Sequence, residues 1–426
     1  MSSLRKWLQP GLNVKRWLIA LVVGVTFLAF GLAYLLVDVY RTQALPGVFY
    51  YLTLQFVPRL GRAVLFGALG IGVTVVALAS LSATLLAAAT RTTSNTSLVD
   101  VLHRQRARRG PRIVAIGGGT GLSTLLRGLK QHTSNLTAIV TVADDGGSSG
   151  RLRRQLGVLP PGDFRQCIAA LAEAEPLMTE LFEYRFDEGA ELEGHSFGNL
   201  FIAAMQRITG SFEKALEESG RVLKVAGQIL PATLCDVTLS AELANATVVH
   251  GESAVPHSGE AIDHVFLLPP DPPAYPDAVA AIHAANLIVI GPGSLYTSVM
   301  PNLLVPGLAE ALREAHAMRI YVVNVASQPG ETDGYVLSDY LRALQQHIGR
   351  LPIDCVLVNG RLVDLPPEWG VTQVGPEPGA AVFGIPIVSA DLLDTNRTTR
   401  HDPAKLAAQL LRLYKQRRRV WLMARR

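Results

Sequence analysis

The chain has 426 residues, of which 49% are hydrophobic and 17% charged, and its net charge is +4. This length and composition predict a large core and more than one structural unit. The three cysteines, Cys167, Cys235 and Cys355, are far apart and form no C-x-x-C, which excludes a disulfide framework and a thiolate zinc site. The positive excess gathers at 103–112 and 415–426. We interpret these basic clusters as segments that lie beside anionic lipid, so no nucleic-acid partner is expected.

Two long uncharged segments occupy the first part of the chain, at 18–37 and 63–90. Each is long enough to cross a bilayer as a helix, which disfavours a buried soluble helix or a cleaved signal peptide. Basic residues precede the first segment and follow the second, so both termini are expected on the cytoplasmic side of a multi-pass protein of the cell membrane. The predicted parts are a membrane hairpin over 1–90 with spans at about 18–37 and 64–89, a basic linker over 91–111, and a cytoplasmic nucleotide-binding domain over 112–426.

From residue 112 onward, apolar β-branched runs alternate with helical patterns. This alternation predicts a Rossmann-like α/β fold with a doubly wound, mostly parallel sheet. Residues 228–275 are less regular and predict a short antiparallel excursion. Strands are expected at 112–117, 136–143, 222–227, 246–250, 286–291, 319–326, 354–358 and 385–389. Helices are expected at 122–131, 163–174, 176–184, 197–208, 211–219, 276–284, 306–316, 335–348 and 403–418.

Four glycines end the first expected strand: Gly117, Gly118, Gly119 and Gly121. A strand, a glycine turn and a helix start bring exposed backbone N–H groups and a positive helix end to a ligand, which suits phosphate. The spacing matches neither standard fingerprint, because Leu122 stands where G-x-G-x-x-G needs glycine and the P-loop lysine is missing. A nucleotide phosphate site is predicted here, with a purely structural βα turn as the alternative.

Further polar loops follow other expected strands, at the carboxyl ends where an open α/β sheet binds ligands. The stretch G-P-G-S-L-Y-T at 291–297 is a second candidate anion cradle. The loop N-V-A-S-Q-P-G-E-T-D at 324–333 is a candidate sugar contact, and His195 and Asn199 could face substrate. Structural turns, solvated loops and an N-cap role for Ser196 are the alternatives.

The stretch D-D-G-G-S-S-G-R at 144–151 combines acids, glycines and an arginine. Asp144 and Asp145 would meet ribose or a metal, and Arg151 could hold a phosphate. Asp163 is expected as a helix N-cap. The predicted ligand-binding residues are Gly118, Gly119, Thr120, Gly121, Leu122, Ser123, Asp144, Asp145, Arg151, Asn199, Gly291, Gly293, Ser294, Tyr296, Thr297, Asn324, Gln328, Glu331, Thr332 and Asp333.

The sequence indicates no catalytic residue, because it contains no convincing Ser-His-Asp set, no H-E-x-x-H and no defined acid/base pair. Asp144 and Asp145 are the candidate metal ligands, and Mg²⁺ is the candidate metal, although whether a metal binds is left open. No other cofactor is assigned. The oligomeric state, including a homo-oligomer, is also left open.

Seven ordered blocks between 112 and 415 resemble one family. They are G-G-G-T-G-L-S-T-L-L-R-G-L-K, A-D-D-G-G-S-S-G-R-L-R, P-P-G-D-F-R, H-S-F-G-N-L, L-C-D-V-T-L-S-A-E-L, G-P-G-S-L-Y-T-S-V-M-P-N-L and Q-P-G-E-T-D-G. These blocks are similar to the YvcK-type gluconeogenesis factors, which belong to the CofD-like, or 2-phospho-L-lactate transferase, superfamily. The membrane hairpin is an addition to the soluble pattern of the best-known members.

The resemblance implies a Rossmann-like core that binds a UDP-sugar and a role in cell shape and cell-wall synthesis under gluconeogenic growth. Members of this branch are treated as binding or regulatory proteins, so enzymatic activity is left open. The alternative is a phospholactate-type transferase that uses a nucleotide-activated donor and Mg²⁺. Leu122-Ser123 stands where the transferase branch has Pro-Lys, which disfavours that alternative. An NAD(P)-dependent oxidoreductase, suggested by the fold alone, is a weaker third hypothesis.

Overall fold

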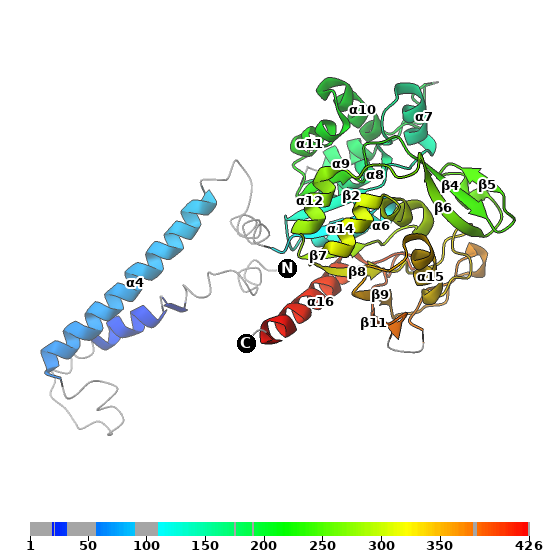
Figure 1. Cartoon of the computed structure of the whole chain (residues 1–426). Coiled ribbons are helices and arrows are strands. Elements are labelled where there is room, and N and C mark those ends of the chain that lie inside the picture. Colours follow the sequence, from blue (N-terminus) through cyan, green and yellow to red (C-terminus); the bar gives the residue numbers. More distant parts are fainter. Residues whose placement is uncertain are drawn as a thin grey trace. The chain divides into compact units, whose positions relative to one another are not determined.

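The computed structural model describes residues 19–20, 22–31, 57–89, 110–173, 176–189, 191–377 and 381–424. The chain divides into two compact units, Met1–Arg106 and Ala107–Arg426 (Figure 1).

The first unit contains a long apolar helix, α4 (Arg59–Ala89), and a short one, Val22–Gly31. Among the described residues, one helix is long and apolar enough to span a bilayer, with its most apolar window at Leu60–Ala77. The two helices approach closely where glycines leave room, because a Cβ added to Gly70 would lie 2.8 Å from the backbone nitrogen of Leu28. Residues 18, 21 and 32–37 of the first predicted span lie outside the described residues.

The second unit is built on a sheet in the order β10-β11-β9-β8-β7-β1-β2-β3. All neighbouring strands are parallel except the pair β10 and β11. The predicted Rossmann-like, mostly parallel sheet is therefore confirmed. Its strands are β1 (Ile113–Gly117), β2 (Leu136–Val140), β3 (Gln228–Pro231), β7 (Leu287–Ile290), β8 (Met318–Val322), β9 (Cys355–Asn359), β10 (Ala381–Val382) and β11 (Ile385–Ala390).

Helices cover both faces of this sheet, with α6, α8 and α16 packed together and α12 against α14 (Figure 1). The core strands are apolar runs because they are buried on both sides; every residue of β1, β7 and β9 is buried. The helices are α6 (Gly119–Leu129), α7 (Gly147–Leu156), α8 (Gly162–Leu171), α9 (Pro176–Glu183), α10 (Phe197–Thr209), α11 (Phe212–Val222), α12 (Pro276–Ala284), α13 (Met300–Leu303), α14 (Pro306–Glu314), α15 (Leu337–Ile348) and α16 (Pro403–Ala424). Short 3₁₀ turns lie at Val255–His257 and Pro367–Trp369, and a π-helical turn at Leu295–Val299.

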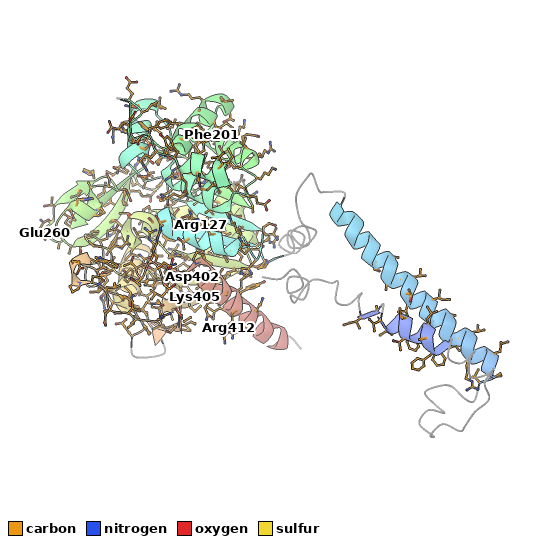
Figure 2. All side chains as sticks on the ribbon, turned by 180° about the vertical axis from the view of Figure 1, so that it is seen from behind. Arg127, Phe201, Glu260, Asp402, Lys405 and Arg412 are labelled. Atoms are coloured by element: carbon orange, nitrogen blue, oxygen red, sulfur yellow. The ribbon has the colours of Figure 1, made fainter. Side chains whose placement is uncertain are left out.

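The antiparallel excursion is a separate three-stranded sheet in the order β5-β4-β6. Its strands are β4 (Thr238–Leu243), β5 (Val248–His250) and β6 (Ile262–Leu268), and Glu260 lies at its outer tip in Figure 2. One strand prediction was wrong. The strand expected at 222–227 is displaced to β3, because α11 continues to Val222. Residues 147–156, for which no helix or strand was predicted, form α7.

The strand order reverses direction at β1, which lies between β2 and β7. The chain from β1 leads to β2 on one side, whereas later strands β7, β8, β9 and β11 extend the sheet on the other side. The loops after β1 and β7 therefore leave the same edge in opposite directions. An open α/β sheet has its ligand crevice at such a switch point.

The opposite end of the sheet is held by an ion network around Asp354, just before β9. Asp354 accepts from Arg319 at 3.1 Å and from Arg417 at 2.7 Å. Burial acts to raise the pKa of Asp354, but hydrogen bonds from the two arginines outweigh it and lower the pKa. This stabilisation is therefore present above the ordinary carboxyl pKa and is lost as pH falls through the folded-state value.

We expect Asp354→Asn to lower the free energy of unfolding by about 2 kcal/mol at neutral pH, since charge-assisted hydrogen bonds of two arginines are lost. Urea unfolding of the variant and of the exposed control Asp364→Asn would measure the difference. A loss that persists unchanged below the folded-state pKa of Asp354 would contradict the electrostatic origin.

Candidate functional site

The glycine loop after β1 and the loop after β7 form the base of a cleft. Gly118 is the N-cap of α6, and Gly119 has φ +59°, so the chain turns sharply from strand to helix. At Gly121 the two loops touch, because an added Cβ would lie 2.7 Å from the carbonyl carbon of Pro292 and 2.9 Å from Cα of Gly293. Glycine is thus required here by close approach of two backbones.

This cleft has a volume of about 520 Å³ and lies at the carboxyl ends of β1, β7 and β8. The helix α6 points its N-terminus into the cleft, where its positive end and backbone N–H groups favour an anion. The lining residues are Gly118, Gly119, Thr120, Gly121, Thr124, Pro292, Gly293, Ser294, Ser298, Asn324, Val325, Ala326, Ser327, Gln328, Trp369, Val371, Thr399, Arg400 and His401. Eight of the residues predicted to bind ligand are among them: Gly118, Gly119, Thr120, Gly121, Gly293, Ser294, Asn324 and Gln328.

A chain of side-chain amides fixes the β7 and β8 loops against each other. The backbone N–H of Gly293 donates to Asn324 Oδ1 at 3.0 Å, and Asn324 Nδ2 donates to Gln328 Oε1 at 2.9 Å. Gln328 Nε2 then donates to Ser294 Oγ at 2.6 Å. Three cleft residues are therefore held in one orientation before any ligand arrives, which lowers the entropy cost of binding.

Other predicted residues lie behind the cleft wall rather than on it. Glu331 Oε1 accepts from Thr297 Oγ1 at 3.1 Å, and Asp333 accepts from the N–H of Gly330 at 2.7 Å. Thr332 Oγ1 accepts from the N–H of Gln328 at 2.9 Å. These contacts shape the 328–333 loop. Leu122, Ser123, Tyr296 and Thr297 are buried, and Gly291 turns the chain after β7 with φ +74°.

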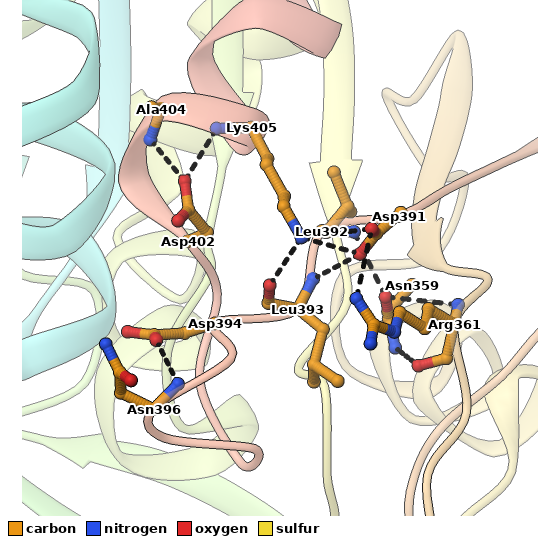
Figure 3. Close-up of polar contacts among 10 residues, drawn as sticks. All are labelled: Asn359, Arg361, Asp391, Leu392, Leu393, Asp394, Asn396, Asp402, Ala404 and Lys405. Atoms are coloured by element: carbon orange, nitrogen blue, oxygen red, sulfur yellow. Dashed lines mark hydrogen bonds and ion pairs between the residues drawn. The ribbon is translucent and has the colours of Figure 1, made fainter.

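Residues just before α16 line the cleft although they are far from the glycine loop in sequence. Figure 3 shows the polar contacts around this segment. Lys405 Nζ binds both carboxylate oxygens of Asp391 at 3.0 Å and donates to the carbonyl of Leu393 at 2.9 Å. Asp402 Oδ1 accepts from the N–H groups of Ala404 and Lys405, both at 2.8 Å, and so caps α16. This network fixes the preceding residues Thr399, Arg400 and His401 in the cleft wall.

Three lining residues offer recognition chemistry that sequence reasoning missed. Trp369 exposes 48% of its surface at the rim, and Arg400 is a cation in the lining. His401 is buried, and burial lowers its pKa to about 4, although a hydrogen bond with the Val323 carbonyl acts to raise it. Its Nε2 has no partner among the described residues. No local motif marks these residues, because only the fold brings them to the glycine loop.

A group of carboxylates lies beside the glycine loop. Asp163 accepts from the N–H of Gly119, and its Oδ2 occupies the space that a Cβ on Gly118 would need. Burial, followed by the charge of Asp144, raises the pKa of Asp163 to about 7. Burial and the charges of Asp144 and Asp163 raise the pKa of Glu252 to about 8. The N-cap prediction for Asp163 was wrong, because α8 begins at Gly162 with Pro161 as its cap.

Asn199 and His195 belong to a polar network next to these carboxylates. Asn199 Nδ2 donates to Ser148 Oγ at 3.0 Å, and Ser148 Oγ contacts His195 Nδ1 at 2.9 Å. Arg165 Nε donates to Asn199 Oδ1 at 3.1 Å. Asn199 therefore orients Arg165, and the positive charge of Arg165 acts to lower the pKa of Asp163. The alternative role of Ser196 as an N-cap is confirmed by the hydrogen bond that its side chain accepts from the N–H of Asn199.

The double acid and the arginine after it are engaged with the backbone. Asp144 Oδ1 accepts from the N–H of Gly146 at 2.9 Å, and Asp145 Oδ1 accepts from the N–H of Ser253 at 2.9 Å. Arg151 Nη2 donates to the carbonyl of Glu193 at 2.6 Å and is absent from the cleft lining. Within the described ranges, no three His, Cys, Asp or Glu side chains form a metal-binding group. Mg²⁺ would fit this region only with ligand phosphates and water completing its shell, which is how Mg²⁺ is commonly bound.

Comparison with known proteins agrees with the fold and the loops. A model of the 2-phospho-L-lactate transferase CofD family matches residues 113–369. The gluconeogenesis factor of Bacillus subtilis is 46% identical over 315 residues, covering 72% of this chain and 99% of that protein. A relative from Nostoc sp. (strain PCC 7120) is 47% identical over 437 residues, covering 96% of this chain and 92% of that protein. The crystal structure of a UPF0052 family member from Bacillus halodurans gives a TM-score of 0.67 at 43% identity, covering 71% of this chain and 99% of that chain.

Proposed function

We propose that this chain, which belongs to the 2-phospho-L-lactate transferase CofD family, binds a UDP-sugar in the cleft at the carboxyl ends of β1, β7 and β8. The observation that carries the proposal is the position of the α6 N-terminus, whose first-turn backbone and positive end lie in the cleft where the Pro292–Gly293 loop packs against Gly121. This arrangement suits the diphosphate, and Arg400 adds a cation to the same cleft.

The remaining lining supplies groups for the base and the sugars. The exposed ring of Trp369 offers a face on which a nucleobase can stack. His401 is buried in the cleft wall and is neutral above its lowered pKa of about 4, so it adds no charge there. Ser294, Ser298 and Gln328 are further hydrogen-bonding partners. The chemistry of the cleft thus matches an anionic ligand that carries a base and hydroxyl-rich sugars.

We further propose that the chain acts as a gluconeogenesis factor, coupling nucleotide-sugar supply to cell shape and cell-wall synthesis during gluconeogenic growth. The similarity to the Bacillus subtilis gluconeogenesis factor supports this role.

A location at the cell membrane, with the large unit on the cytoplasmic side, is also proposed. The helices of the first unit expose apolar side chains such as Leu60, Val64 and Val22, with 62–75% of their surface accessible. Glycine-mediated packing of Val22–Gly31 on α4 is typical of helices in a bilayer. The Nostoc relative aligns with 96% of this chain, so the similarity includes this unit.

Calorimetric titration of residues 110–426 with UDP-N-acetylglucosamine tests the binding proposal. The fragment corresponds to the second compact unit. We expect saturable heat and a higher Tm at excess ligand, because a ligand stabilises the folded state to which it binds. The absence of heat at millimolar ligand, in protein shown to be folded by circular dichroism, would refute the proposal.

A phospholactate-type transferase activity is the second candidate, and the carboxylates of Asp144, Asp163 and Glu252 beside the cleft favour it. A metal-bridged nucleotide needs positioned charge more than a nucleophile. Mg²⁺-dependent turnover that is lost in Asp145→Asn would support this activity over binding alone.

A further inference from the structure

The end of the sheet opposite the cleft carries a row of polar residues. The N–H of Arg112, just before β1, donates to Asn286 Oδ1 at 2.9 Å just before β7. The row continues with Arg319 in β8 and Asp354 before β9, which are hydrogen-bonded at 3.1 Å. The order of these strands is β9-β8-β7-β1. These residues therefore mark the amino-terminal edge of four adjacent parallel strands.

Exposed cations surround this row. Helices between parallel strands run opposite to them, so α14 and α15 end at this edge. Arg313 in the last turn of α14 donates to the carbonyl of Ile348 at the end of α15, at 2.9 Å. Arg350 follows α15 and is exposed, and Lys415 and Arg417 lie on the part of α16 that reaches Asp354. Figure 2 shows Arg412 further along this helix than Asp402 and Lys405. We define the basal patch as Arg112, Arg313, Arg350, Lys415 and Arg417.

Few acids offset the basal patch. Asp354 is paired with both Arg319 and Arg417, so these three side chains together carry one net positive charge. Glu314 lies near His283, at 3.8 Å, at the ends of α14 and α12. By contrast, Asp144, Asp163 and Glu252 gather beside the cleft. The exposed cations of the basal patch therefore gather at the end of the unit opposite the cleft, although the whole chain has a net charge of only +4.

We propose that the basal patch rests on the anionic surface of a membrane, with the ligand cleft opening away from it. The inference rests on the proposed membrane location. The chain enters the second unit at the patch itself, because Arg112 directly precedes β1. A Lys or Arg held near anionic lipid contributes about fivefold to binding. Five such cations on one face therefore suffice to orient the second unit at the membrane surface.

The test uses the full chain in nanodiscs that carry a headgroup-labelled acceptor lipid, made of phosphatidylcholine with or without phosphatidylglycerol. A donor dye is attached to His316→Cys, in the exposed turn between α14 and β8, or to Glu368→Cys, exposed at the cleft rim. Both are made in a Cys235→Ser background, because Cys167 and Cys355 are buried.

In nanodiscs that contain phosphatidylglycerol, we expect stronger energy transfer from position 316 than from position 368. This difference should be absent with phosphatidylcholine alone and should decrease as salt is added, because salt screens the attraction between the patch and the lipid. The triple variant Arg313→Gln, Arg350→Gln, Lys415→Gln should lower the docking constant on the order of 100-fold. The matched triple Arg154→Gln, Arg207→Gln, Lys214→Gln, exposed on α7, α10 and α11, should not. Equal transfer from both dyes in chain that has entered the nanodiscs would overturn the orientation alone. A chain that fails to enter them would overturn the membrane location and the orientation with it.

Discussion

Gly121→Ala is expected to destabilise the protein by about 1–3 kcal/mol and to abolish UDP-sugar binding at concentrations that saturate the wild type. The added Cβ would lie 2.7 Å from the carbonyl carbon of Pro292 and 2.9 Å from Cα of Gly293. Both of these atoms belong to the backbone, so no side-chain rotation can relieve the contact. Relief requires the loop after β7 to move away from the α6 N-terminus. That movement separates the two halves of the anion cradle and breaks the bond from Gly293 to Asn324.

Gly220→Ala is the matched control, because Gly220 lies within α11 and an added Cβ there would find its nearest neighbour, Val225, at 3.6 Å. This change should leave ligand affinity unchanged and stability unchanged or slightly higher, since alanine favours helix over glycine. Thermal unfolding and calorimetry on both variants separate the two effects. A Gly121→Ala protein that binds with wild-type affinity would show that the contact between the loops does not form the site.

The sheet and the glycine cradle were predictable because their signals are local. Strands that are buried on both faces, such as β7 and β9, consist of largely uninterrupted apolar residues. The turn at Gly117–Gly121 can be read from glycines placed between such a run and a helical pattern. In contrast, Val222, Leu223 and Val225 form an apolar run that favours a strand, although α11 continues to Val222. Gly227, with φ +120° against the backbone of Leu136, then displaces the strand to β3.

The remaining features depend on contacts between distant segments. Helix α7 begins with Gly-Ser-Ser-Gly, which is a poor helix sequence, and it forms where Asp144 accepts the Gly146 N–H and Ser148 contacts His195. The cleft wall at Thr399–His401 depends on the pairing of Asp391 with Lys405 (Figure 3). Asp163 has an ordinary N-cap context in sequence, but its carboxylate bonds Gly119, more than forty residues earlier. No spacing rule reveals such contacts.

The buried carboxyl of Asp163 predicts an unusual pH dependence. Its pKa rises from 3.8 to about 7 on folding, mainly through burial and then through the charge of Asp144. Between these values the folded state binds more protons than the unfolded state, so the free energy of unfolding falls as pH rises. The loss is complete above pH 7 and amounts to as much as about 4 kcal/mol. Glu252, whose pKa rises from 4.5 to about 8, adds a fall of comparable size between these values.

Asp163→Asn should remove about half of this slope, leaving the part due to Glu252. It should also stabilise the protein at pH 8, because the amide keeps an oxygen for the Gly119 N–H without the buried charge. It should also strengthen UDP-sugar binding at pH 8, since a carboxylate beside the α6 N-terminus repels the diphosphate. Urea unfolding and calorimetry between pH 5 and 8 would measure both, with the exposed Asp364→Asn as control. If the variant keeps the wild-type slope, Asp163 is ionised throughout this range. The α6 N-terminus would then carry a permanent negative charge, and a phosphate could enter only with a bridging cation.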